Sequence, residues 1–209
     1  MQSRSAIALA ALLCAAPLAA DCASPHVEPS AIIRVGASEV PNAEILSVAA
    51  AELLKEDSDL KVHVYKDYVQ PNLALADKEL DANFFQHVPY LENFTRERGL
   101  KLKALCAVHI EPMGVYSSRL KSLAELGRKD RVAIPNDPAN GGRALRLLAD
   151  AGLIKLREGA GAGATPRDIV DNPKRLRIVE LEAAALPRAL GDAAAAVINA
   201  NYALAAGLD

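Results

Sequence analysis

The sequence predicts an α/β protein that is built as two lobes, and three observations lead to this prediction. β-rich runs alternate with helical patterns from Ala31 to Ala206, which is typical of mainly parallel strands layered with helices. The alternation forms two series that meet near Glu111–Ser117, so we expect a cleft between two lobes. The length of 209 residues accommodates one large or two small domains.

The composition is that of an ordinary globular protein. Apolar residues make up 51% of the chain, and 24 basic side chains face 26 acidic ones, for a net charge of −2. Wholesale disorder is therefore excluded. A nearly neutral chain also lacks the basic field on which nucleic-acid binding depends, so we expect no nucleic-acid partner.

The N-terminus has the pattern of a targeting segment. A positive start, Met1–Arg4, precedes the apolar run Ala6–Leu18, and Ala20 is followed by a polar residue. We expect residues 1–20 to be a secretory signal peptide and residues 21–30 to be a flexible start of a periplasmic protein. A membrane anchor and a mistranslated start are the alternatives.

A lipid anchor is the other alternative at this end of the chain. A lipidated cysteine needs a small residue before it, whereas Cys14 follows Leu13 and Cys22 follows Asp21. The sequence therefore favours a soluble periplasmic protein over a lipid-anchored one.

The first series is expected to form the first lobe, residues 31–113. Strands are expected at Ala31–Ala37, Leu60–Tyr65 and Leu102–Ile110, with a short strand or turn at Asp81–Phe85. Helices are expected at Pro41–Glu56, Pro71–Leu80 and Pro89–Arg98. The first helix has apolar residues at helical spacing, and Gly99 is a suitable C-cap for the last.

The second series is expected to form the second lobe, residues 114–209. Extended segments are expected at Gly114–Ser117, Arg131–Ile134, Leu153–Leu156, Leu176–Leu181 and Ala195–Ile198. Helices are expected at Ser122–Leu126, Pro138–Ala151, Thr165–Val170, Ala184–Leu190 and Tyr202–Ala206. Asp137 as N-cap and Pro138 in the first turn give the second of these helices a well-defined start.

Aromatic residues gather in one short stretch of the first lobe. Six of the eight aromatic residues lie between Tyr65 and Phe94, and Asn83–His87 stands at the end of an expected strand. α/β folds place ligand sites at such strand ends, and aromatic walls suit a small, partly apolar ligand. The candidates for such walls are Tyr68, Phe85, His87 and Tyr90. The alternative is that these rings fill the core.

His87 also allows an enzymatic interpretation, with Asp81 or Glu92 as its helper. A hydrogen-bonding role in the wall of a binding site is favoured, because no Ser or Cys stands in a nucleophile elbow. No metal-ligand spacing links the four histidines, His26, His63, His87 and His109. We therefore expect no catalytic residue, metal or cofactor, and no enzyme.

Arg143 is the candidate anchor for an anionic group. It lies within the first two turns of the helix that starts at Pro138, where free backbone N–H groups attract an anion. Its guanidinium can bind a carboxylate through two parallel hydrogen bonds. Gly141 and Gly142 allow close approach at this point. The alternative is a surface arginine beside Arg146 on a solvated helix face.

Asn199 and Asn201 follow a buried strand and are the third candidate group. If the chain stays extended there, both side chains lie on one face. Their amides can accept from an ammonium group and donate to a carboxylate. Turn or helix-capping roles are an equally good interpretation.

Several long strings in these regions resemble one protein family. DYVQPNLALADKELDANFFQHVPYL, IEPMGVYS, VAIPNDPANGGRALRLL and AAVINANYAL resemble the MetQ/NlpA family, the methionine-binding lipoproteins of bacterial ABC importers. The resemblance covers Ile32–Leu208. It implies a type II-like periplasmic-binding-protein fold, a monomer that captures methionine or a close analogue between its lobes, and the membrane subunits of an ABC importer as partners.

The same resemblance implies roles for the candidate residues. Arg143 would hold the α-carboxylate of the ligand, Asn199 would contact its head group, and Asn201 would assist. The thioether side chain would be lined by Tyr68, Phe85, His87 and Tyr90, since sulfur makes favourable contacts with aromatic rings.

Three features depart from the family pattern. Asn42 stands where relatives often carry His, Val88 replaces a common Gln, and the chain stops at Asp209, well before family members usually end. The last departure implies that the C-terminal segment returning to the first lobe is lacking. We expect such a chain to be less stable, and to bind more weakly, than an extended one. A truncated non-binding paralogue that acts as a surface interaction protein is the alternative function.

Overall fold

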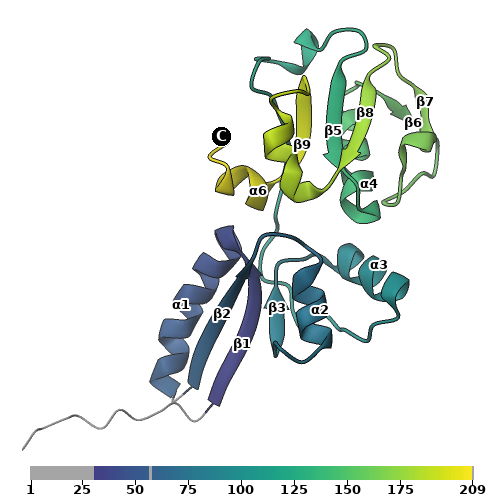
Figure 1. The fold of residues 1–209 in the computed structure, drawn as a ribbon. Coiled ribbons are helices and arrows are strands. Elements are labelled where there is room, and N and C mark those ends of the chain that lie inside the picture. The colour runs from purple at the N-terminus through teal and green to yellow at the C-terminus, as the bar shows by residue number, and fades with distance from the viewer. Residues whose placement is uncertain (1–30, 57, 209) are drawn as a thin grey trace, which may run out of the picture.

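The computed structural model describes residues 31–56 and 58–208. The expected signal peptide, residues 1–20, and the expected flexible segment, residues 21–30, lie outside the described residues. The described chain forms two lobes, each built around its own sheet (Figure 1). The two lobes and the predominance of parallel pairing agree with the α/β architecture expected from the sequence.

The first lobe contains a parallel three-stranded sheet in the order β2-β1-β3. Its strands are β1 (Ala31–Ser38), β2 (Ser58–Tyr65) and β3 (Ala82–Phe84). Its helices are η1 (Glu39–Ala43), α1 (Glu44–Leu53), η2 (Leu54–Glu56), α2 (Gln70–Ala76) and α3 (Val88–Arg98). Helix α1 lies beside β2, whereas α2 and α3 lie on the β3 side (Figure 1).

The ends of these elements follow local chemistry. Gly99 adopts the left-handed conformation, with φ of 66°, and caps the C-terminus of α3 as expected. Helix α2 ends at Ala76, four residues before the expected end at Leu80, because Lys78 takes a φ of 63° that no helix allows.

The segment between the lobes differs from the prediction. A strand was expected at Leu102–Ile110, but the described structure assigns no regular element between α3 and Met113. Apolar alternation predicts a strand only where a neighbour can complete its hydrogen bonds, and no described strand pairs with this segment. Its apolar side chains are accordingly exposed, with Leu105 at 87% and Ile110 at 93%.

The second lobe contains a four-stranded sheet in the order β4-β9-β5-β8. Its strands are β4 (Met113–Tyr116), β5 (Arg131–Pro135), β8 (Arg177–Leu181) and β9 (Ala195–Asn199). Only β4 runs antiparallel to its neighbour. A separate antiparallel pair is formed by β6 (Lys155–Leu156) and β7 (Ile169–Asp171).

Helices cover both faces of this sheet. They are η3 (Leu123–Glu125), α4 (Pro138–Asp150), η4 (Pro166–Asp168), η5 (Ala183–Ala185), α5 (Leu186–Ala189) and α6 (Ala200–Ala205). The helix expected at Thr165–Val170 is a single turn, η4, that leads into β7, because Asp168 closes a capping box with Thr165 and the chain then pairs with β6.

The core of the second lobe follows the two-residue period of its strands. Val132 and Ile134 of β5 pack with Leu145 and Leu148 of α4. Ala133, between them, faces the opposite cluster, which includes residues of α5 and α6. Together these layers hold β5 and β9 rigidly, so the carboxyl ends of both strands reach the first lobe in fixed positions.

The described helices include none that is both long and apolar enough to cross a lipid bilayer.

Candidate functional site

Aromatic rings of the first lobe form a cluster centred on Tyr68. The ring of Tyr68 lies 5.8 Å from that of Phe85 and 5.7 Å from that of Tyr90, and the Tyr90 hydroxyl donates to the Tyr68 carbonyl over 2.9 Å. Phe85 and Tyr90 are buried, each 7% exposed. The loop after β3 and the start of α3 therefore meet the loop before α2.

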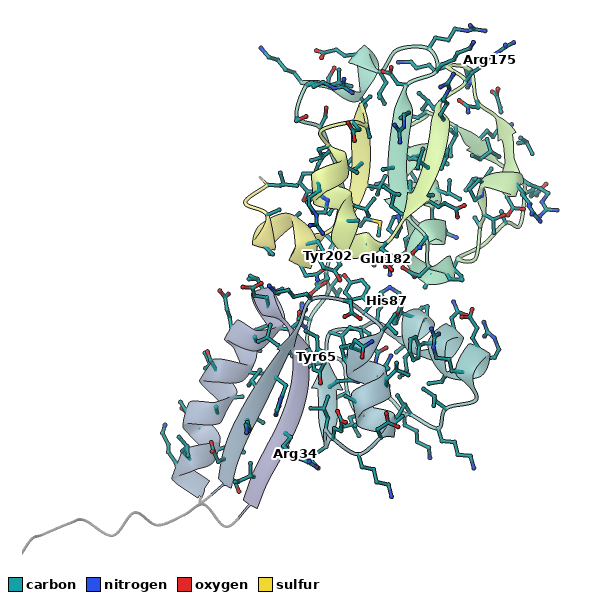
Figure 2. The ribbon with its side chains drawn as sticks, viewed as in Figure 1. Arg34, Tyr65, His87, Arg175, Glu182 and Tyr202 are labelled. Carbon is teal, nitrogen blue, oxygen red and sulfur yellow. The ribbon has the colours of Figure 1, made fainter. Side chains whose placement is uncertain are left out.

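The second lobe completes this cluster with a residue that the sequence analysis did not select. Tyr202, in the first turn of α6, places its ring 5.0 Å from that of Tyr68. Its hydroxyl donates to the Lys66 carbonyl over 3.3 Å. Figure 2 shows Tyr202 and His87 where the two lobes face each other. We call Tyr68, Phe85, Tyr90 and Tyr202 the aromatic cluster.

A second cluster of side chains joins the lobes through Asn140. Its carboxamide oxygen, Oδ1, receives hydrogen bonds from Arg143 Nη1 at 3.1 Å and Asn199 Nδ2 at 2.9 Å, and lies 3.1 Å from His87 Nε2. Asn140 is 1% exposed. His87 comes from the first lobe and the other three come from the second. We call Asn140, Arg143, Asn199 and His87 the polar centre.

The start of α4 fixes the orientation of the Asn140 amide. Asp137 is the N-cap, as predicted, and accepts from the Asn140 backbone N–H at 2.8 Å. Both carboxylate oxygens of Asp137 also accept from Asn140 Nδ2, at 3.1 and 3.0 Å. A carboxylate can only accept, so it holds the NH₂ group on its own side and turns Oδ1 toward the polar centre.

Arg143 lies one turn further along α4, half-buried. Besides Asn140, its guanidinium binds the Glu111 carbonyl, 3.0 Å from Nη2, which ties α4 to the segment between the lobes. Gly142, immediately before it, lies where a neighbouring loop comes close to α4. A Cβ on Gly142 would lie 2.0 Å from the Ala162 carbonyl oxygen, so the close approach is that of a neighbouring loop.

The two asparagines at the end of β9 and the start of α6 do not share one extended face. Helix α6 starts at Ala200, so Asn199 ends the strand while Asn201 lies in the helix. Both are nevertheless buried between the lobes, each 4% exposed. Asn201 Oδ1 accepts from the Tyr68 hydroxyl over 2.6 Å, and Asn199 belongs to the polar centre. Asn199 Oδ1 is buried without a hydrogen-bond partner among the described residues.

His87 has a defined tautomer in this arrangement. Its Nδ1 accepts from the Tyr90 backbone N–H at 3.2 Å, as the N-cap of α3, so Nε2 carries the proton that faces Asn140. Burial lowers the pKa of His87, and positive Arg143 adds to this, while the Asn140 hydrogen bond opposes it. Asp81, its suggested helper, instead pairs with Arg34 at 2.9 Å, and Figure 2 shows Arg34 well away from His87.

The polar centre can bind an anion. One carbonyl oxygen has two lone pairs, yet three donors converge on Asn140 Oδ1. A carboxylate offers about four acceptor positions and makes stronger, charge-assisted bonds with Arg143. Beside these donors, the free Asn199 Oδ1 can accept from an ammonium group. Half-buried Glu111, whose pKa is raised by burial, adds a nearby acidic group.

Seven residues were selected from the sequence: Tyr68, Phe85 and Tyr90 lie in the aromatic cluster, His87, Arg143 and Asn199 lie in the polar centre, and Asn201 contacts Tyr68. Asn140, Glu111 and Tyr202 were not selected, and Asp137 was predicted only as a helix cap. The spacing of Asn140 and Arg143, one helical turn apart, is a signal that could have identified Asn140. Glu111 contributes a backbone carbonyl to Arg143, for which no side-chain pattern exists.

Comparisons with known proteins place this geometry in context. The model of the NlpA lipoprotein family matches residues 33–209. The probable D-methionine-binding lipoprotein MetQ of Vibrio cholerae is 47% identical over 173 residues, which cover 82% of this chain. The chain spans 64% of the length of that relative.

Solved structures share the fold. A nutrient binding protein from Burkholderia cenocepacia bound to methionine is 49% identical, with a TM-score of 0.81 over 84% of this chain and 75% of that one. An ABC transporter periplasmic substrate-binding protein from Coxiella burnetii is 43% identical, with a TM-score of 0.81 over 85% of this chain and 75% of that one. The periplasmic-binding-protein fold expected from the sequence is thereby confirmed.

Proposed function

Because the chain belongs to the NlpA lipoprotein family, we propose that it captures methionine or a close analogue between its lobes and delivers it to an ABC importer. It does so as a monomer in the periplasm, either soluble or held by a lipid anchor, and its protein partners are the membrane subunits of the importer. The relatives named for methionine binding and the structure bound to methionine support this assignment.

The single observation that carries the proposal is the polar centre beside the aromatic cluster. Three donors, one of them a guanidinium, converge on the single amide oxygen of Asn140, which has only two lone pairs, and the neighbouring Asn199 Oδ1 has no donor among the described residues. This combination is complementary to the carboxylate and ammonium groups of one amino acid. The aromatic rings then receive an apolar, sulfur-containing side chain.

In this proposal, Arg143 and His87 bind the carboxylate, and Asn199 accepts from the ammonium group. Asn201 acts indirectly, since its Oδ1 already holds the Tyr68 hydroxyl. Tyr68, Phe85 and Tyr90 contact the side chain, joined by Tyr202.

The same contacts support binding without catalysis. His87 Nδ1 is held by the Tyr90 backbone N–H, and Nε2 carries a proton directed at Asn140, so the ring is placed to donate a hydrogen bond and not to accept a proton. The Asp81 carboxylate, held by Arg34, has a pKa of about 2. We infer that the protein is not an enzyme.

A thermal-shift panel of amino acids tests the proposal. A ligand that binds only the folded chain raises the melting temperature, by the equivalent of about 2.7 kcal/mol at a hundred times its dissociation constant. We expect shifts with L- or D-methionine and none with aspartate or lysine. A panel without any shift would instead support the non-binding paralogue, in which Asn140 Oδ1 permanently occupies the position of the carboxylate.

A further inference from the structure

The first lobe contains a cluster of three side-chain amides that lies behind the proposed site. Asn72 of α2 is completely buried, at 0% exposed. Its Nδ2 donates to Gln86 Oε1 over 2.9 Å, and its Oδ1 accepts from Gln86 Nε2 over 2.8 Å and from Asn83 Nδ2 over 2.9 Å. We call Asn72, Asn83 and Gln86 the amide trio.

The hydrogen bonds of the trio are nearly complete. Gln86 Nε2 uses its second proton on Asn83 Oδ1 at 3.1 Å, and Asn83 Nδ2 uses its second proton on the Pro71 carbonyl at 3.3 Å. Each amide therefore fixes the orientation of the other two, because reversing one would set donor against donor. Removing any member of such a network destabilises the folded chain, because its partners stay buried without hydrogen bonds.

The position of the trio in the chain connects it to the proposed site. Asn72 lies four residues after Tyr68, in the helix that follows the Tyr68 loop. Asn83 and Gln86 flank Phe85, and Gln86 immediately precedes His87, the N-cap of α3. The trio thus joins the two segments that carry the aromatic residues and the histidine of the first lobe.

We propose that Asn72 is a positioning residue for ligand binding: it sets the distance between Tyr68 and Phe85, and the approach of His87 to Asn140, without touching the ligand. The identity of the ligand in this inference rests on the proposed function, whereas the arrangement of Tyr68, Phe85 and His87 can be measured without any ligand. The only other described side-chain hydrogen bond between these two segments joins Tyr90 to the Tyr68 carbonyl.

Two variants test this role. Asn72→Leu keeps the number and branching of the side-chain heavy atoms and removes all three hydrogen bonds. Gln86→Met removes the partner amide from a less buried position, and it serves if Asn72→Leu does not fold. Asn172→Ala is the matched control, because Asn172 also holds a loop through its amide, bonded to the Leu176 backbone, but in the second lobe.

Two readouts separate positioning from general stability. The first is the nuclear Overhauser effect between the rings of Tyr68 and Phe85, recorded without ligand. The second is the affinity for L- and D-methionine, measured by calorimetry. We expect Asn72→Leu and Gln86→Met to weaken the ring-to-ring signal and to lower the affinity at least fivefold. Because both variants break the same contacts, combining them should add little further loss.

The control should lower the melting temperature and change neither readout. Folded Asn72 and Gln86 variants that retain the ring-to-ring signal and the wild-type affinity would overturn the inference. If the wild-type chain bound neither methionine enantiomer, the proposed function would fail, whereas the ring-to-ring signal would still decide the role of Asn72.

Discussion

The hydroxyl of Tyr68 donates a hydrogen bond to Oδ1 of Asn201 over 2.6 Å, and this bond joins two residues that are 133 positions apart and belong to different lobes. Burial raises the pKa of Tyr68 well above its ordinary value, so the phenol stays protonated and acts as the donor. Binding between lobes requires that they meet in one geometry, and this contact is one of the few that define it.

Replacing Tyr68 by Phe tests the contribution of this bond. Tyr68→Phe leaves Asn201 Oδ1 buried without a donor when the lobes meet, so we expect methionine binding to weaken by about 1–3 kcal/mol. Calorimetry measures the loss. Tyr116→Phe is the matched control, since the Tyr116 hydroxyl makes no hydrogen bond to the described residues, and equal affinities for the wild type and Tyr68→Phe would contradict the role assigned to this contact.

His87 should make stability depend on pH. Because burial lowers its pKa below the ordinary 6.5, the unfolded chain binds more protons than the folded one as the pH falls through that value. The free energy of unfolding therefore decreases as the pH is lowered from about 7.5 to 5. His87→Asn keeps the N-cap acceptor and does not titrate, so it should lose less stability over this range.

Denaturant unfolding at each pH measures this difference. The raised pKa of Glu111 has the opposite sign, because a folded state that holds a proton more tightly gains stability as the pH falls. That contribution is common to both proteins and cancels in the comparison. Asp137 and Arg143, the charged groups that also face His87, are present in both proteins. Parallel pH profiles for the two proteins would rule out His87 as the titrating group.

The aromatic cluster should select the ligand by its apolar side chain. The hydroxyls of Tyr68, Tyr90 and Tyr202 all donate to groups within the protein, so none has a proton left to donate to a polar side chain. Competition binding should therefore favour methionine over glutamate and lysine, whose charged ends would lose hydration. Methionine sulfoxide should bind at least tenfold more weakly than methionine, which corresponds to a loss of about 1.4 kcal/mol in binding free energy. Equal displacement by all four ligands would show that the rings do not discriminate.

Gly142 should not tolerate a side chain. The Cβ of Gly142→Ala would overlap the Ala162 carbonyl, so we expect a loss of about 1–3 kcal/mol in the free energy of unfolding. Gly163, in the adjacent loop, is the matched control because a Cβ there would meet nothing within 4 Å. Thermal or denaturant unfolding compares the two variants, and similar stabilities would show that the loop moves aside freely.

The elements that the sequence predicted best are those with local signals. Asp137, Pro138 and Gly99 mark helix ends through caps that depend only on neighbouring residues, and the structure retains them. The segment Leu102–Ile110 was wrongly predicted as a strand because a strand also needs a partner, which its own residues do not reveal.

The candidate site shows the same limit. Arg143 and His87 could be selected from their local surroundings, but the role of Asn140 depends on contacts with residues 53 and 59 positions away. Asn201 was selected on the assumption of an extended chain, whereas it reaches Tyr68 from a helix. Contacts between lobes arise from tertiary packing, so no local pattern predicts them.

Titration with L- and D-methionine in a calorimeter, of the wild-type chain in parallel with Arg143→Ala, tests whether the polar centre binds methionine through Arg143. Arg143 supplies the charge of the polar centre, so its loss should cost about 2–5 kcal/mol of binding if the ion pair is desolvated. Arg146→Ala, on an exposed face of the same helix, is the matched control and should bind like the wild type. We expect saturable binding by the wild type that is lost in folded Arg143→Ala. Unchanged affinity in that variant, or no binding of either enantiomer by the wild type, would contradict it.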